Sequence, residues 1–237
     1  MAAADGSRAD GRQLRWARHN EERRRLIIEA ALAVVEAHEP GAPFHVQEIA
    51  DRCGLGRSVI YRHFADRADL DRAVRSAIIQ QLADELLPAV TLEGTVPDIV
   101  ERVITRYVSW AIAHPALHRL AESDPVAGSG PLQRGLEQIA EQVAALIRVA
   151  VEALAVPLTE EESAVVDPLA FGLVGAVFSA VRRWLASDDR RPGAPVLVAT
   201  ITDSVWYLLE GHARSFGIVL RRDQPVPELL EEAARAR

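Results

Sequence analysis

Apolar residues recur at helical spacing along the whole chain, and no convincing run of alternating apolar and polar residues interrupts them. Proline and glycine divide this pattern, and Pro40, Gly41 and Pro43 end the first expected helix. The expected helices cover residues 21–38, 46–52, 57–64, 66–87, 95–114, 131–154, 159–187, 196–216 and 227–236. Asp167-Pro168 is expected to restart or kink the helix over 159–187. The pattern predicts an all-α fold of nine or ten helices.

Composition narrows the class of protein. The chain has 237 residues, of which 49% are hydrophobic and 26% charged, which is typical of a globular protein with one large or two small domains. Cys53 is the single cysteine, so no intramolecular disulfide is expected. The absence of lysine excludes Schiff-base and phosphate-loop chemistry. No N-terminal apolar segment and no 18-residue uncharged apolar window is found, so we expect a cytoplasmic protein without a membrane partner.

Charge is distributed unevenly. The net charge is −7, yet residues 1–75 hold 13 Arg against 12 acids, whereas residues 76–237 hold 14 Arg against 22 acids. Residues 1–21 are small, polar and basic, and we expect a mobile arm there. A basic front on an acidic body indicates an N-terminal region that faces nucleic acid.

Residues 44–64, FHVQEIADRCGLGRSVIYRHF, predict two short helices joined by a tight turn. In Cys53-Gly54-Leu55-Gly56, glycine permits positive φ while Leu55 reaches the core. Ile60 and Phe64 should point inward from the second helix, which leaves a polar outer face: Arg57, Ser58, Tyr61, Arg62 and His63. A helix of this width fits the major groove of DNA, so the segment is interpreted as a helix-turn-helix.

The run IADRCGLGRSVIYRHFADRADL resembles the signature of the TetR family of transcriptional regulators. Tyr61, His63, Phe64, Arg67 and Leu70 stand at the family's characteristic positions, and His114-Pro115-Ala-Leu117 is similar to an element of its regulatory domain. The resemblance implies three parts: the arm 1–21, a DNA-binding domain over 22–82 with its helix-turn-helix at 45–64, and an effector-binding and dimerisation domain over 83–237. It also implies a homodimer, most often a repressor, that leaves a pseudo-palindromic operator when a small, mostly apolar effector binds.

The expected DNA-binding residues divide into two groups. Arg57, Ser58 and Arg62 are candidates for contacts to base edges, whereas Tyr61, His63 and Arg67 are expected to contact phosphates. Three positions depart from the family pattern: His45 replaces a capping Ser or Thr, Gly56 replaces Ser, and Val59 replaces Thr. His45 retains a donor for phosphate, Gly56 loses a hydroxyl contact, and Val59 offers an apolar contact to a thymine methyl group.

Two further sites follow from the resemblance together with the apolar stripes. The expected effector pocket is walled by aromatic residues and one titratable group, namely Tyr107, Trp110, His114, Phe171 and Phe178. The expected dimer interface lies on residues 168–187 and 196–216 and uses small and apolar residues, namely Gly172, Ala176, Ala180, Val205, Leu208 and His212.

Other functions are weighed against this one. His114 and His118 have the spacing of two metal ligands on one helix, but Pro115 interrupts that helix, and we expect no metal and no cofactor. No nucleophile or phosphate-binding motif indicates an enzyme. The remaining alternative is an all-α ligand-binding or protein-interaction module without operator binding, which the changes at Gly56 and Val59 keep open.

Overall fold

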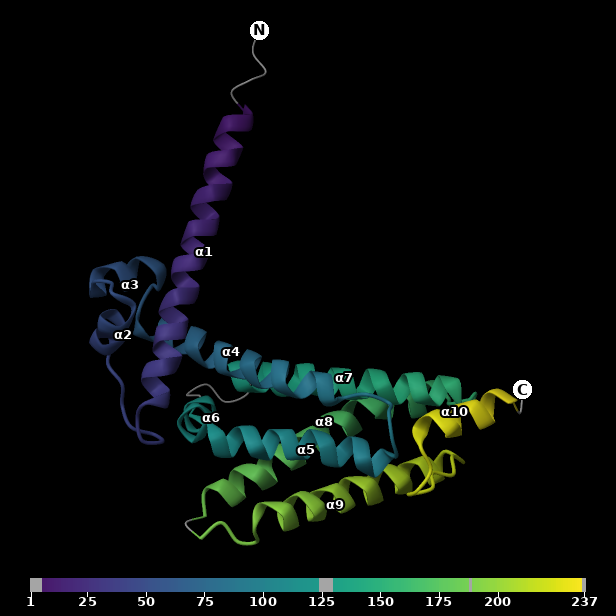
Figure 1. The fold of residues 1–237 in the computed structure, drawn as a ribbon. Helices are drawn as coiled ribbons and strands as arrows, with labels where there is room; N and C mark the ends of the chain where they lie inside the picture. The colour runs from purple at the N-terminus through teal and green to yellow at the C-terminus, as the bar shows by residue number, and fades with distance from the viewer. Residues whose placement is uncertain (1–5, 124–129, 188, 236–237) are drawn as a thin grey trace. The chain divides into compact units, whose positions relative to one another are not determined.

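The computed structural model describes residues 6–123, 130–187 and 189–235 (Figure 1). Within these ranges the chain forms ten α-helices and one short 3-10 helix and no strand, which confirms the all-α prediction. The helices are α1 Gly6–Glu36, α2 Val46–Cys53, α3 Arg57–His63, α4 Arg67–Leu86, η1 Leu87–Ala89, α5 Val96–Ala113, α6 Pro115–Glu122, α7 Pro131–Ala153, α8 Glu160–Leu185, α9 Ala194–Ser215 and α10 Val226–Arg235.

The chain divides into two compact units, one of residues 1–79 and 114–132 and the other of residues 80–113 and 133–237. This division differs from the domain boundary expected at residue 82, because α6 belongs to the first unit. Ala116 and Leu117 of α6 are buried, and His114, which precedes α6, binds the Glu36 carboxylate of α1. Burial and this contact join α6 to α1 rather than to the helices that flank it in sequence.

The core of the first unit is built from the inner faces of α1 to α4. Its largest fully buried side chains include Ile27 of α1, Ile49 of α2, Ile60 of α3 and Phe64 at the end of α3. Gly54 ends α2 with φ of +65°, a left-handed conformation that glycine adopts without steric cost. The predicted helix-turn-helix is therefore present, with its turn at the expected residues.

Besides α6, which the sequence analysis did not expect, two helices differ from the sequence expectation. α1 begins at Gly6 rather than Glu21, so residues 6–20 of the predicted arm are helical, while residues 1–5 lie outside the described ranges. α8 runs from Glu160 to Leu185 without a restart at Pro168. Proline removes one backbone donor from this helix, whereas Val166 and Ala170 on either side are both buried, so packing outweighs the loss.

The second unit contains α5 and α7 to α10, together with the end of α4. Side chains cap the starts of two of its helices, α5 and α8. The Thr95 N–H donates to the Asp98 carboxylate at 2.9 Å, and the Thr159 N–H donates to the Glu162 carboxylate at 2.8 Å. These hydrogen bonds lower the pKa of both carboxyl groups, because they favour the ionised form. The start of α10 is tied to the turn before α5 by the Val226 N–H, which donates to the Gly94 carbonyl at 2.8 Å.

His118 of α6 is a titratable side chain inside the first unit. It is 5% exposed, and its Nδ1 lies 3.3 Å from the Glu122 carboxylate. Burial lowers the pKa of His118 to about 4, and the nearby charge of Arg119 acts in the same direction. The imidazole is therefore neutral at neutral pH.

This burial predicts a pH dependence of stability. The pKa of His118 is lower in the folded than in the unfolded chain, so the unfolded state takes up the proton first as pH falls. Between pH 7 and pH 5 the wild-type free energy of unfolding should fall by about 2 kcal/mol more than that of His118→Gln. Urea unfolding of both proteins at the two pH values measures the difference, and parallel losses would show that His118 does not carry it.

Candidate nucleic-acid interface and cavity

The outer face of α3 presents side chains to solvent. Arg57, Ser58, Tyr61 and Arg62 are exposed as predicted, and Val59 is half-buried. Ile60 is fully buried and Phe64 is 1% exposed, so these two residues anchor the opposite face. Gly56 is the exposed N-cap of α3 in an extended conformation. The helix therefore holds a short row of donors on a rigid support.

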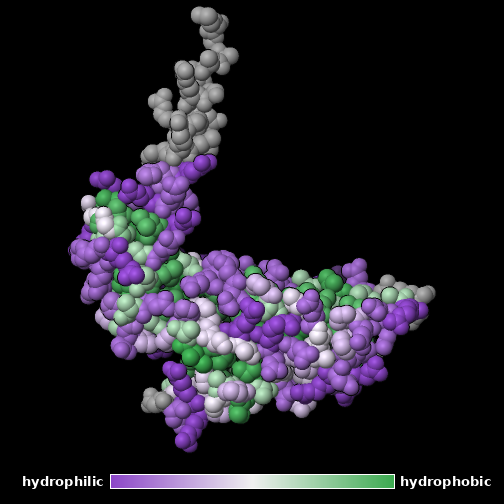
Figure 2. Space-filling model, in the orientation of Figure 1, coloured by the Kyte–Doolittle hydropathy of each residue, from purple (hydrophilic) through white to green (hydrophobic). Residues whose placement is uncertain are grey.

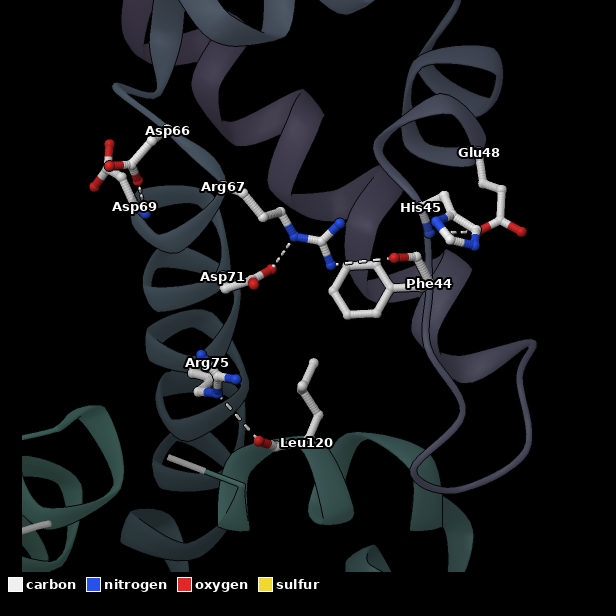
Figure 3. A network of polar contacts seen from close by, with 9 residues as sticks. All are labelled: Phe44, His45, Glu48, Asp66, Arg67, Asp69, Asp71, Arg75 and Leu120. Carbon is white, nitrogen blue, oxygen red and sulfur yellow. Dashed lines mark hydrogen bonds and ion pairs between the residues drawn. The ribbon is translucent and has the colours of Figure 1, made fainter. Parts of the chain in front are cut away.

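His45 is the exposed N-cap residue of α2. Its backbone N–H donates to Glu48 Oε2 at 2.7 Å, an interaction drawn in Figure 3. This hydrogen bond is the largest cause of a lowered pKa at Glu48. The Glu48 carboxylate thus satisfies the backbone N–H of the N-cap residue, which is the part of a capping box that an acidic residue at this position supplies, and His45 is exposed.

His63 differs from the expectation of an outward polar residue. Its side chain is half-buried, and Nδ1 is buried without a hydrogen-bond partner among the described residues. Burial lowers the pKa of His63, and the positive charges of Arg23 and Arg24 on α1 lower it further. His63 is therefore a neutral group inside a cationic cluster, and it is half-buried where the sequence predicted an outward polar side chain.

Arg24 is a positioning residue that the sequence analysis did not identify. Its guanidinium lies over the Phe64 ring, 4.1 Å from the centroid, and Nη1 donates to the His63 carbonyl. A cation at this carbonyl satisfies the C-terminal end of α3. The basic run Arg23-Arg24-Arg25 and the aromatic Phe64 were both visible in the sequence, but they are about 40 residues apart, and local patterns do not pair them.

Arg67 lies in a second arginine–phenylalanine contact (Figure 3). Its Nε donates to Asp71 at 2.7 Å, its Nη2 donates to the Phe44 carbonyl at 3.1 Å, and its guanidinium lies 4.5 Å from the centroid of the Phe44 ring. The side chain predicted to contact phosphate is thus engaged inside the unit, and we assign it to positioning. It joins α4 to the segment that leads into α2.

Two further hydrogen bonds hold α4, one at its start and one near its middle. The Asp69 N–H donates to Asp66 Oδ1 at 2.7 Å, which caps the first turn. One turn beyond Asp71, Arg75 donates from Nε to the Leu120 carbonyl of α6 at 3.3 Å. Figure 3 shows these two contacts at different heights of α4. α4 is therefore held at both points by side chains of its own unit.

The second unit encloses a cavity of about 320 Å³. Residues of α4, α5, α7, α8, α9 and α10 line it, and the lining is apolar apart from Thr91, Tyr107 and His212. Tyr107 and Phe178 stack at one part of the wall, with centroids 6.1 Å apart and planes inclined by 16°. These two residues of the predicted aromatic wall do meet at a cavity.

Three residues of the predicted pocket lie elsewhere. Trp110 is buried like Tyr107 but is not part of the cavity lining. His114 belongs to the first unit, where it binds Glu36. Phe171 is 38% exposed on α8. The predicted pocket is corrected accordingly, since the sequence pattern did not show which helix faces turn inward.

The outer face of α8 and α9 carries apolar and small residues. Gly172 and Ala176 are exposed and Ala180 is half-buried, while Leu208 is 48% exposed. Figure 2 shows hydrophobic residues, in green, at the surface where α8 and α9 lie in Figure 1. Val205 and His212, also predicted at a dimer interface, instead line the cavity. They are corrected to the inner face of α9.

α8 is long and apolar enough to cross a membrane by length and composition alone. A core helix of a soluble protein passes the same test, and α8 contributes Val166 and Leu173 to the cavity wall. One side of α8 therefore faces the interior of its unit.

The two histidines considered as metal ligands have separate partners. His114 contacts Glu36 on α1, whereas His118 contacts Glu122 within α6. In the part of the chain that the structure describes, no group of three or more His, Cys, Asp or Glu side chains has the arrangement of a metal site.

Comparisons with known proteins agree with this geometry. Residues 27–74 match the model of the bacterial regulatory proteins of the tetR family. An uncharacterised HTH-type transcriptional regulator of Mycobacterium tuberculosis is 26% identical over 223 residues, which cover 93% of this chain and 92% of the relative.

Solved structures share the fold. A tetR-family transcriptional regulator from Streptomyces coelicolor has a TM-score of 0.61 at 21% identity and covers 91% of this chain and 89% of its own. RolR, solved in complex with resorcinol, has a TM-score of 0.55 at 16% identity and covers 92% of this chain and 96% of its own. The match to the family model and the shared fold support a DNA-binding regulator.

The contacts of Arg67 predict that substituting this residue lowers the free energy of unfolding. Arg67→Ala leaves the Phe44 carbonyl and Asp71 without their donor and should lower the free energy of unfolding by about 1–3 kcal/mol. Arg67→Lys keeps the charge but cannot reproduce the forked geometry, so it should lose most of the same stability. Arg57→Ala, an exposed control, should stay within about 0.5 kcal/mol of the wild type. Equal urea midpoints for all four proteins would contradict the positioning role.

Proposed function

Since residues 27–74 place this chain in the TetR family of bacterial regulatory proteins, we propose that it is a cytoplasmic, homodimeric transcriptional repressor released from its operator by an apolar effector. The observation that carries the proposal is the exposed row Arg57, Ser58 and Arg62 on a helix anchored by Ile60 and Phe64. A polar face on a buried support is what a recognition helix in a major groove requires.

The exposed residues of the helix-turn-helix fall into two groups, those that would contact base edges and those that would contact phosphates. The guanidiniums of Arg57 and Arg62 have the forked geometry that guanine O6 and N7 accept, and Ser58 adds a short donor. Val59, half-buried, reaches only a thymine methyl group. Tyr61 and His45 supply phosphate contacts, and the Gly56 N-cap leaves the first N–H groups of α3 accessible to phosphate. The exposed face of α3 is supported from the interior of the unit by three further residues, Arg24, Arg67 and His63.

A homodimer follows from the uncovered face of α8 and α9. Phe171 and Leu208 are exposed there, and a side chain added at Gly172 would meet nothing within 4 Å in its own chain. Exposed apolar side chains beside small residues favour close approach of a second copy. Two copies would present two α3 helices to half-sites one or more helical turns apart.

The effector site is the cavity of the second unit. Tyr107 and Phe178 stand in its wall, and the RolR complex shows that a protein of this fold binds a small molecule. An effector that binds better to the arrangement without DNA would shift the population away from the operator. The same cavity receives Leu82 and Leu86 from α4, the helix that follows α3 in the chain.

The recognition role of Arg57 is testable on DNA. Arg57→Ala should cost about 1–3 kcal/mol of binding free energy on the operator and relax base preference at one position in each half-site. Genomic-fragment selection with purified protein supplies the operator, and titrations on operator and scrambled duplexes across a salt series give the affinities.

The matched control is Arg148→Ala on α7, which removes the same charge from the second unit and should leave both affinities unchanged. If Arg57→Ala weakens operator and scrambled duplex equally, Arg57 contacts phosphate and not a base. If the wild type binds neither duplex, the protein is not an operator-binding regulator.

The dimer interface is testable by charge insertion. Leu208→Arg places a guanidinium in the proposed apolar interface and should raise the dimer dissociation constant on the order of 100-fold, because an unpaired charge is buried. Val219→Arg is the control, since Val219 is 75% exposed and lies outside α8 and α9. Analytical ultracentrifugation at micromolar concentration should find a dimer for the wild type and the control. A monomeric wild type would refute the proposed assembly.

A further inference from the structure

We infer that the cavity of the second unit binds one long, unbranched hydrocarbon chain, such as the acyl chain of a fatty acid or of its thioester. This inference names the chemical class of the proposed effector and so rests on the proposed function. It follows from the chemistry of the wall, from the length over which the helices line it, and from the position of its polar groups.

The residues that line the cavity carry no charged side chain of the Asp, Glu, Lys or Arg type. The polar ones are Thr91, Tyr107 and His212. The hydroxyl of Thr91 already accepts a hydrogen bond from Arg102 Nη2 at 2.9 Å. A ligand with charges or hydroxyl groups along its whole length would lose its water here without gaining enough partners. A hydrocarbon has no such loss.

The lining extends along the helices rather than around one spot. On α7 the lining residues run from Leu136 to Val151 at steps of one to four positions, which spans about 22 Å at the rise of an α-helix. On α8 they run from Val165 to Phe178, or about 20 Å. A single aromatic ring would leave most of this length without contacts, whereas an extended chain would use all of it.

The polar groups indicate where a head group would lie. Thr91 precedes α5 and lies near the start of α10, which is tied to the same turn by Val226 and Gly94. Arg102, bonded to Thr91, also donates to the Ala89 and Glu93 carbonyls, so positive charge lies beside this end. We place an anionic head group there and the methyl end of the chain toward Tyr107 and Phe178.

Direct binding to the full-length protein tests the inference. The probes are octanoate, laurate, palmitate, palmitoyl-coenzyme A and resorcinol, each below its micelle concentration and measured by calorimetry. Affinity should rise about fourfold for each added methylene group until the cavity is filled. The comparison of palmitate with its thioester distinguishes the two sources of the chain. Affinity independent of chain length, or tighter binding of resorcinol than of palmitate, would overturn the inference.

A matched pair of variants locates the chain. Val143→Trp fills the middle of the cavity and should lower palmitate affinity at least tenfold while octanoate affinity changes much less. Val149→Trp makes the same substitution on the same helix at a residue that is 52% exposed and should bind both like the wild type. Equal palmitate affinity in all three proteins would overturn the inference. The wild-type chain-length series decides it independently if Val143→Trp does not fold.

The same ligands added to the protein–operator complex separate this inference from the proposed function. If palmitate binds with the expected chain-length dependence but the protein binds no DNA, the ligand class stands and the regulator function fails. If the protein binds its operator but none of the acyl ligands binds, the regulator stands and the inference fails. Release of DNA by palmitate and not by octanoate supports both.

Discussion

The helix-turn-helix is held in place by two arginine side chains that lie over phenylalanine rings. α3 has seven residues, which is too short to be stable as an isolated helix, so its position must come from tertiary contacts. Arg24 supplies one of them, over Phe64 and at the His63 carbonyl, whereas Arg67 joins α4 to the segment before α2, between Phe44 and Asp71. Because Ile60 and Phe64 are also buried, the exposed face of α3 has one orientation within its unit.

The same contacts organise charge around that face. Arg67 is balanced by Asp71, and Arg72 by Asp69, so the first turns of α4 are close to neutral. Near His63, by contrast, burial and the positive charges of Arg23, Arg24 and Arg62 all lower the pKa of the imidazole. Positive potential therefore concentrates where α1 meets the end of α3. That is where a polyanion would gain most, while the net charge of the whole chain stays negative.

Local sequence patterns were sufficient for much of this structure, because caps, turns and helix starts depend on a few adjacent residues. Thr95, Thr159, Gly54 and the exposed residues of α3 could be identified in that way. Arg24 could not, since its partner lies 39 residues away and the run of arginines is also typical of a solvated surface. α6 was missed because Pro115, interpreted as the end of a helix, occupies the first turn of the next one.

The inner and outer faces of α9 explain the remaining errors and connect the two proposed sites. Val205, Leu209, His212 and Phe216 recur every three or four residues and line the cavity, whereas Thr200, Tyr207, Leu208 and Gly211 are exposed on the other side. Both faces of α9 carry apolar residues that favour burial against another element. Helical periodicity alone therefore does not tell which face packs against the core. One helix thus forms a wall between a ligand cavity and a candidate dimer surface. Because packed interiors deform little, filling the cavity would change the position of the helix rather than its internal shape.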